Sequence, residues 1–155
     1  LKSKNTPSAI ALSRQKLPYI NPSHTKENKS ELGAYIVSAT SQNNMVTLVA
    51  SGSEVELALQ AQKELKEVNI DSKVVSMPCQ ELFNQQSIIY RNKIINKDVP
   101  VITIEASSVS SWEKYSENNM GIETFGESAP FKEVYNHFNL TSAKIVELAK
   151  KIITK

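Results

Sequence analysis

Residues 45–65, MVTLVASGSEVELALQAQKEL, decide the fold class of this chain, because a strand pattern changes to a helix pattern across one short turn. The run at 45–50 is almost continuously apolar, as expected of a strand that is covered on both faces. Ser53 and Glu56 form a capping-box pair, which predicts the start of a helix. The helix, of about fourteen residues, carries one apolar-facing stripe at helical spacing. This stripe consists of Val55, Ala58, Leu59, Gln62 and Leu65.

A helix with such a stripe needs a sheet beneath it, and other parts of the chain supply the strands. The further predicted strands are 35–38, 73–77 and 100–106. The further predicted helices are one or two pieces within 80–95, a helix at 130–138 and a last helix capped by Thr141. Strands that alternate with helices in this way predict an α/β layer fold with a largely parallel sheet.

The composition is that of a soluble globular chain of one ordinary domain. Of its 155 residues, 40% are hydrophobic and 22% are charged, which permits a packed core. The net charge of +2 and the scattered lysines argue against nucleic acid as a partner, because surfaces that bind nucleic acid gather basic side chains on one face. Cys79 is the single cysteine and excludes an internal disulfide, and no apolar run is long enough to cross a bilayer.

The chain starts at Leu1 without a methionine and without a signal-peptide pattern. We therefore expect a fragment or a processed product of a cytoplasmic protein, with an organelle as the alternative. Residues 8–13, SAIALS, have the pattern of a short buried strand that ends before Pro18. The polar stretch 21–33 has the composition of a linker.

Arg14 directly follows the predicted strand 8–13, and Arg91 is the only other arginine among eighteen basic residues. A guanidinium grips a phosphate or a carboxylate through two parallel hydrogen bonds, whereas lysine acts as a point charge. The residues alone leave two roles open for Arg14. One is an ion pair that holds the linker, and the other is a grip on an anion.

Two places at the carboxyl ends of predicted strands are candidate ligand sites. The SGSE turn (51–54) lies where open α/β sheets present amides to phosphates. It lacks the glycine spacing of nucleotide-binding motifs, and Glu54 stands where an anion would dock, so we favour a plain capping turn. Glu105 has the position of an acid, a base or a ribose acceptor. We favour a structural carboxylate bonded to amides of the following SSVSS loop.

Patterns for a nucleophile or a metal are weaker, and we interpret them as chance. The G-x-S pattern at 126–128 has Pro130 where a nucleophile elbow has its last glycine. Ser13 and Lys16 match S-x-x-K but lie outside a helix. Cys79 could pair with His24 or His137, but the sequence offers no third metal ligand and no motif that would orient a histidine. We interpret Trp112, Tyr115 and Tyr35 as core or interface aromatics.

Several stretches together resemble the C-terminal part of transketolases. They cover nearly the whole chain in the order and spacing of that family: ALSRQKLP (11–18), LVASGSEVELAL (48–59), KVVSMPCQELFNQQ (73–86), Tyr90–Arg91 and TFGESAP (124–130). The departures are Lys16, where asparagine is usual after SRQ, Gly33–Ala34–Tyr35 in place of a double-glycine version, and residues 23–32, which match nothing in the family.

The resemblance implies an activity and a division of labour. Transketolases are homodimeric, thiamine diphosphate-dependent transferases that move a two-carbon ketol unit between sugar phosphates in the pentose phosphate pathway. The first two domains hold the cofactor, its divalent cation (magnesium or calcium) and the catalytic residues, and these domains lie outside this sequence. We therefore expect no bound cofactor and no turnover from the chain alone.

The resemblance also implies a domain organisation. Residues 1–22 would be the terminal strand and exit of the pyrimidine-binding domain, 23–34 a linker, and 35–155 the C-terminal domain. This domain is expected to be a three-layer α/β/α fold with a mostly parallel five-stranded sheet and one antiparallel strand.

In this family the arginine of the SRQ motif binds the phosphate of the sugar substrate at the entrance of the active site, and the matching residue is Arg14. We expect Arg14 to bind substrate and expect no catalytic, cofactor-binding or metal-binding residue in the chain. The expected partners are sugar phosphates, the two preceding domains and a second subunit, without nucleic acid or membrane. The alternatives are a regulatory ligand-binding module, with Glu105 in its site, and a subunit-interaction module, with Trp112 at its interface.

Overall fold

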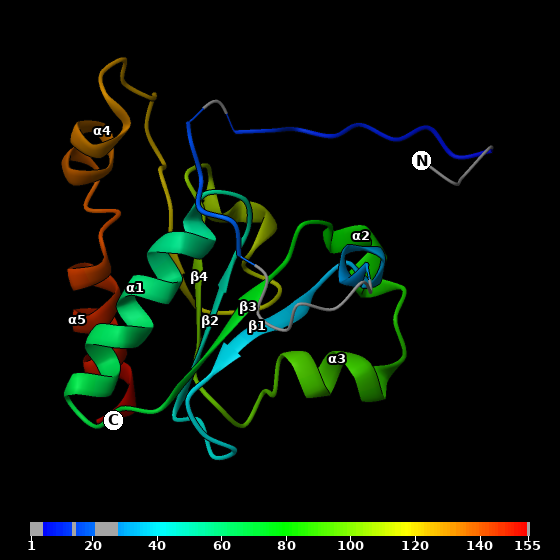
Figure 1. Ribbon diagram of the computed structural model, residues 1–155, viewed down its shortest axis with the longest axis horizontal. Helices are drawn as coiled ribbons and strands as arrows, with labels where there is room; N and C mark the ends of the chain where they lie inside the picture. The colour runs from blue at the N-terminus through cyan, green and yellow to red at the C-terminus, as the bar shows by residue number, and fades with distance from the viewer. Residues whose placement is uncertain (1–4, 14, 21–27, 155) are drawn as a thin grey trace.

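The structure is a computed structural model, and it describes residues 5–13, 15–20 and 28–154 (Figure 1). A five-stranded sheet with the strand order β1-β3-β2-β4-β5 lies at its centre. The strands are β1 (Tyr35–Ala39), β2 (Val46–Ala50), β3 (Ser72–Ser76), β4 (Val101–Ile104) and β5 (Asn118–Met120).

Strand β2 is the middle of the sheet, with parallel neighbours on both sides. Leu48 pairs with Val74 of β3 and with Ile102 of β4. Strand β5 continues the parallel arrangement beside β4, whereas β1 runs antiparallel on the outer side of β3. Every residue of β2, β3 and β4 is buried, as expected of strands that are covered on both faces. The predicted five-stranded, mostly parallel sheet with one antiparallel strand is confirmed.

Helices cover both faces of the sheet and complete the three layers (Figure 1). On one face, α1 (Glu54–Glu67) lies beside α5 (Ser142–Ile153), and both pack on an apolar cluster that includes Leu48, Leu65, Val74, Ile102 and Ile145. On the other face, a second cluster includes Val49, Val75, Met77, Phe83 and Trp112. The helices on this side are α2 (Gln80–Asn84) and α3 (Ile88–Ile94). The remaining short elements are the 3-10 turns η1 (Lys29–Leu32) and η2 (Val109–Ser111) and the helix α4 (Phe131–His137).

Both predicted helix caps are tested by the structure, with different outcomes. Thr141 caps α5 as predicted, because its side chain accepts a hydrogen bond from the Lys144 amide. The capping box at the start of α1 is wrong. The Ser53 hydroxyl makes no capping bond and donates instead to Oε1 of Glu54 at 2.8 Å, because that buried carboxylate is the stronger acceptor.

The predicted strand at 8–13 is also wrong in this structure. These residues are exposed and form no strand. A strand is stable only when a neighbour satisfies its backbone groups, and among the described residues none pairs with this segment. Strand β5 was not predicted, because its sequence Asn-Asn-Met lacks β-branched residues.

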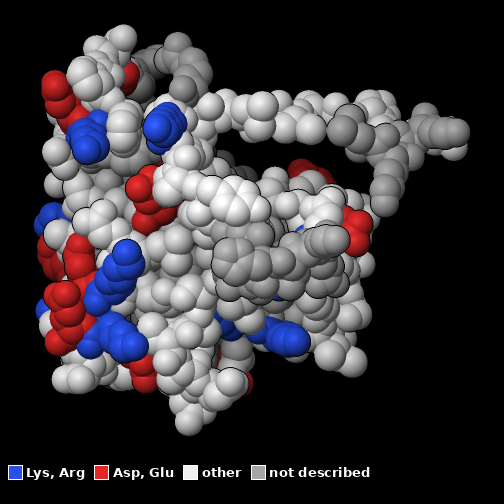
Figure 2. Space-filling model, in the orientation of Figure 1, with Lys and Arg blue, Asp and Glu red and all other residues white. Residues whose placement is uncertain are grey.

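Charged side chains of both signs are interspersed on the surface, without a large area of one sign on the face in view (Figure 2). This arrangement agrees with the scattered lysines of the sequence. No helix among residues 5–13, 15–20 and 28–154 combines the length and the apolar character needed to cross a bilayer.

Candidate functional site

The candidate site lies at the carboxyl edge of the parallel strands. Ser51 follows β2 and Glu105 follows β4, and because these strands are parallel neighbours, the two residues meet. The Ser51 hydroxyl donates to Oε2 of Glu105 at 2.6 Å. Glu105 is therefore a bonded structural carboxylate, as favoured from the sequence, but its hydrogen-bond donor is this hydroxyl and not an amide of the SSVSS loop.

Glu54 is the second carboxylate of the site and is only 3% exposed. Its Oε1 accepts from the Ser53 hydroxyl, and the Tyr135 hydroxyl of α4 donates to the same oxygen. The sequence contained no signal for Tyr135, because it lies 81 residues after Glu54. The SGSE turn is thus occupied by its own acid, which argues against a phosphate site there, although the Ser53 hydroxyl does not cap α1.

Burial and a neighbouring carboxylate raise the pKa values of two groups of the site, Glu105 and Tyr135. Burial raises the pKa of Glu105, the charge of Glu54 raises it further, and the hydrogen bond from Ser51 opposes the shift. Burial, followed by the hydrogen bond to Glu54, raises the pKa of Tyr135 to about 12. The phenol is therefore a hydrogen-bond donor throughout the physiological range.

The raised pKa of Glu105 predicts that the chain loses stability as the pH rises from its ordinary carboxyl value of 4.5 through the raised value. In this window the folded state binds more protons than the unfolded state, so the free energy of unfolding falls with pH. Glu105→Gln should flatten this part of the profile. Urea unfolding of both proteins at several pH values measures the slope, and an unchanged slope in the variant would show that Glu105 does not cause it.

The N-terminal segment comes close to this site. Gly52 has a φ of +49°, and a Cβ on Gly52 would lie 3.8 Å from the Ser13 hydroxyl oxygen. Farther along, Ile20 packs against the cluster under α1 and α5. Arg14 itself lies outside the described residues, so its role stays a prediction.

The other sequence candidates are not brought together with this site. Cys79 directly precedes α2, and its thiol is 3.5 Å from a carboxylate oxygen of Glu81. The His137 ring packs edge-on against the Phe138 ring. Among the described ranges, no three His, Cys, Asp or Glu residues are gathered to hold a metal. His24 lies outside the described residues. Trp112 is 4% exposed and belongs to the core, which argues against its predicted place at an interface.

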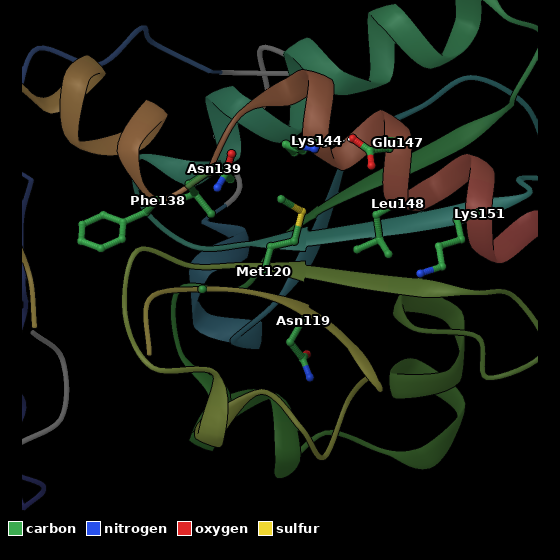
Figure 3. A pocket seen from close by; sticks show the side chains of 10 residues that line it. Asn119, Met120, Phe138, Asn139, Lys144, Glu147, Leu148 and Lys151 are labelled. Carbon is green, nitrogen blue, oxygen red and sulfur yellow. Dashed lines mark hydrogen bonds and ion pairs between the residues drawn. The ribbon is translucent and has the colours of Figure 1, made fainter. Parts of the chain in front are cut away.

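A hollow of about 310 Å³ lies between β5 and α5 (Figure 3). Met120 and Leu148 form its apolar floor. At its rim, the Lys144 ammonium is paired with Glu147 at 2.7 Å. A ligand site normally combines an apolar wall with several convergent polar groups. Because Lys144 is paired along its own helix, we place the functional site at the carboxyl edge and not here.

Comparisons with known proteins identify the family. Residues 33–141 match the family model of the transketolase-like TK C-terminal domain. The transketolase of Sinorhizobium medicae is 40% identical over 159 residues, which cover 100% of this chain and 23% of the relative. The chloroplastic transketolase of Solanum tuberosum is 38% identical, with 96% of this chain and 21% of the relative covered.

Among solved structures, the transketolase of Pichia stipitis in complex with sedoheptulose-7-phosphate aligns with a TM-score of 0.83 and 33% identity. The alignment covers 91% of this chain and 20% of that one. The chain thus spans less than a quarter of the length of the curated relatives it matches. Since the family model covers most of the chain, the chain belongs to the transketolase family and carries its C-terminal domain.

Proposed function

We propose that this chain is the C-terminal portion of an enzyme that transfers a two-carbon ketol unit between sugar phosphates in the pentose phosphate pathway. The observation that carries the proposal is the match to the transketolase of Sinorhizobium medicae over 100% of the chain. A match of that extent includes the SRQ segment before the matched domain as well as the domain itself. The name of the Pichia stipitis complex, which contains a sugar phosphate, supports this substrate class.

In this proposal the chain contributes a substrate contact and architecture. Residues 1–22 belong to the end of the pyrimidine-binding domain, 23–34 form a linker, and 35–155 form the third domain of a homodimeric enzyme. Thiamine diphosphate and its magnesium or calcium ion bind to the preceding domains. The whole protein acts in the cytoplasm, and cell fractionation tests this compartment against an organelle.

Arg14 holds the phosphate of the sugar in this proposal. Its neighbour Ser13 lies beside Gly52 at the carboxyl edge of the sheet, where open α/β sheets place their ligands. A bidentate guanidinium–phosphate contact far from the reacting carbon uses remote binding energy to orient the carbonyl. Such a charge-assisted contact contributes about 1.5–3 kcal/mol.

Arg14→Lys in the full-length enzyme should reduce kcat/KM for phosphorylated acceptors by roughly ten- to a hundredfold, because lysine keeps the charge and loses the two-point grip. For unphosphorylated acceptors, kcat/KM should change little. Steady-state kinetics with a matched pair of aldose acceptors, with and without the phosphate, measures both effects.

Arg91→Lys is the matched control, because Arg91 is the other arginine and lies on α3, across the sheet from the SGSE turn. It should leave the ratio of the two kcat/KM values unchanged. Equal losses on both acceptors in Arg14→Lys would mean that Arg14 has a structural role and no phosphate contact.

A further inference from the structure

We propose that the side-chain amine of Lys73 is an acylation site for small anionic acyl donors, the acyl phosphates, and that the acyl group releases α3 from the sheet. Lys73 belongs to β3 and is only 8% exposed. Charged side chains are seldom buried to this extent without a partner of opposite charge. Neither this amine nor α3 takes part in the activity proposed above.

The amine of Lys73 lies between the sheet and the last turn of α3. Side chains alternate along a strand, so Lys73 faces the same side of the sheet as Val75, whose apolar cluster also contains Ile94 of α3. The Nζ atom of Lys73 donates to the carbonyl oxygen of Lys93 at 3.3 Å. That carbonyl belongs to the last turn of the helix, where a cation is favourable. Lys73 therefore fastens the end of α3 to the sheet.

No acidic group compensates the charge of this amine in the part of the chain that the structure describes. The strand neighbours of Lys73 are Ala39 on β1 and Thr47 on β2, which are neutral, and α3 contains no acidic residue. Within residues 5–13, 15–20 and 28–154, no carboxylate is in ion-pair contact with Lys73. Burial lowers the pKa of Lys73, so more of this amine is neutral than of an ordinary lysine at the same pH. Only the neutral amine has the lone pair that attacks an acyl carbon.

The charges around the amine favour an anionic donor. The last turn of α3 carries two further cations, Arg91 and Lys93. The Nε atom of Arg91 is buried and finds no hydrogen-bond partner among the described residues. Cationic surroundings raise the local concentration of anions, so an acyl phosphate is attracted to this end of α3 and a neutral acyl donor is not.

The acyl transfer balances without a further reactant. The Nζ lone pair attacks the acyl carbon and the carbon–oxygen bond to the phosphate breaks. The phosphate leaves with the electron pair, and the amine gives up one proton to water. The product amide is uncharged and larger than the ammonium, so it loses the charge-assisted bond to Lys93 and no longer fits its buried place. Helix α3 has seven residues, too few to persist without packing, so brief openings admit the donor and the acyl group then prevents closure.

The experiment treats the full-length enzyme with acetyl phosphate and measures the acetylation of each lysine by mass spectrometry. Lys73 should be acetylated, and its labelling should rise at a lower pH than that of free lysine amide in the same tube. Added salt should slow its labelling by acetyl phosphate, because salt screens the attraction, but not its labelling by neutral N-acetylimidazole. Lys66 is the control, since it is exposed and also lies in the last turn of a helix. An unlabelled Lys73 beside a labelled Lys66, a pH profile equal to that of the free amine, or equal salt effects on both reagents would overturn the proposal.

Hydrogen exchange measures the release of α3. The amides of α3 should exchange roughly ten- to a hundredfold faster in the acetylated enzyme, the effect of losing one charge-assisted hydrogen bond. Lys73→Gln removes the charge and should reproduce the increase. Lys73→Arg keeps the charge and, after the same treatment with acetyl phosphate, should show no increase, which controls for acetylation of the other lysines. Unchanged exchange in enzyme acetylated at Lys73 would overturn the release of α3, and this measurement decides the question even where Lys73→Gln fails to fold.

Discussion

Replacing Gly33 with alanine should destabilise this chain by about 3–5 kcal/mol, through backbone strain and overpacking together. Gly33 has a φ of +81°, in the left-handed region that side chains disfavour. A Cβ there would lie 2.1 Å from the Phe83 amide nitrogen and 2.5 Å from the Cys79 carbonyl oxygen. The clash is with backbone and not with a flexible side chain, so α2 itself would have to move.

Two hydrogen bonds hold the backbone at Gly33 close to α2 and α3. The Cys79 amide donates to the Gly33 carbonyl at 3.1 Å, and the Tyr90 hydroxyl donates to the carbonyl of Ala34 at 2.8 Å. Urea unfolding of the 155-residue chain measures the loss. Gly126→Ala is the control, because a Cβ at Gly126 meets nothing within 4 Å. Equal stabilities for the two variants would contradict the tight contact between η1 and α2.

Phe83→Ala should cost about 3–5 kcal/mol, the usual cost of removing a buried aromatic side chain from a core. Phe83 is 2% exposed and belongs to the cluster beneath α2 and α3. Its ring lies 6.0 Å from that of Tyr115, at an interplanar angle of 56°. Alanine leaves a cavity between a short helix and a rigid sheet, and neither collapses easily to fill it.

Phe125→Ala is the matched control for Phe83→Ala, because the Phe125 side chain is 97% exposed in the loop before α4. Thermal and urea unfolding should show a large loss for Phe83→Ala and almost none for Phe125→Ala. A small loss for Phe83→Ala would indicate that the layer of α2 and α3 contributes little to the stability of the fold.

Most elements of the fold could be predicted because their signals are local. The β-branched run KVVSM predicts β3 without any knowledge of its neighbours, and the apolar stripe from Val55 to Leu65 predicts α1. Residues 8–13 show the limit of this reasoning. They have the apolar pattern of a strand, yet a strand exists only where another strand bonds to it, and no described neighbour does so.

The candidate site could be predicted only in part. Glu105 and the SGSE turn each follow a strand that its apolar pattern predicts. Because the sheet is parallel, both lie at its carboxyl edge. Tyr135 could not be found, because its helix is short and its partner Glu54 is distant in the sequence. The capping box failed for a related reason. The spacing of Ser53 and Glu56 is a local signal, but the Ser53 hydroxyl donates to the carboxylate of Glu54, whose burial depends on the whole fold.

The sequence by itself determined the fold class and the family, because these depend on patterns of neighbouring residues and on the order of several motifs. The phosphate contact of Arg14 is an expectation that the family resemblance implies. Only the tertiary structure decided which strands are adjacent, that Ser51 bonds to Glu105, and that the Tyr135 hydroxyl donates to Glu54. Hydrogen bonds between distant side chains depend on distances of a few ångströms, and the chain reaches those distances only after its apolar faces have packed.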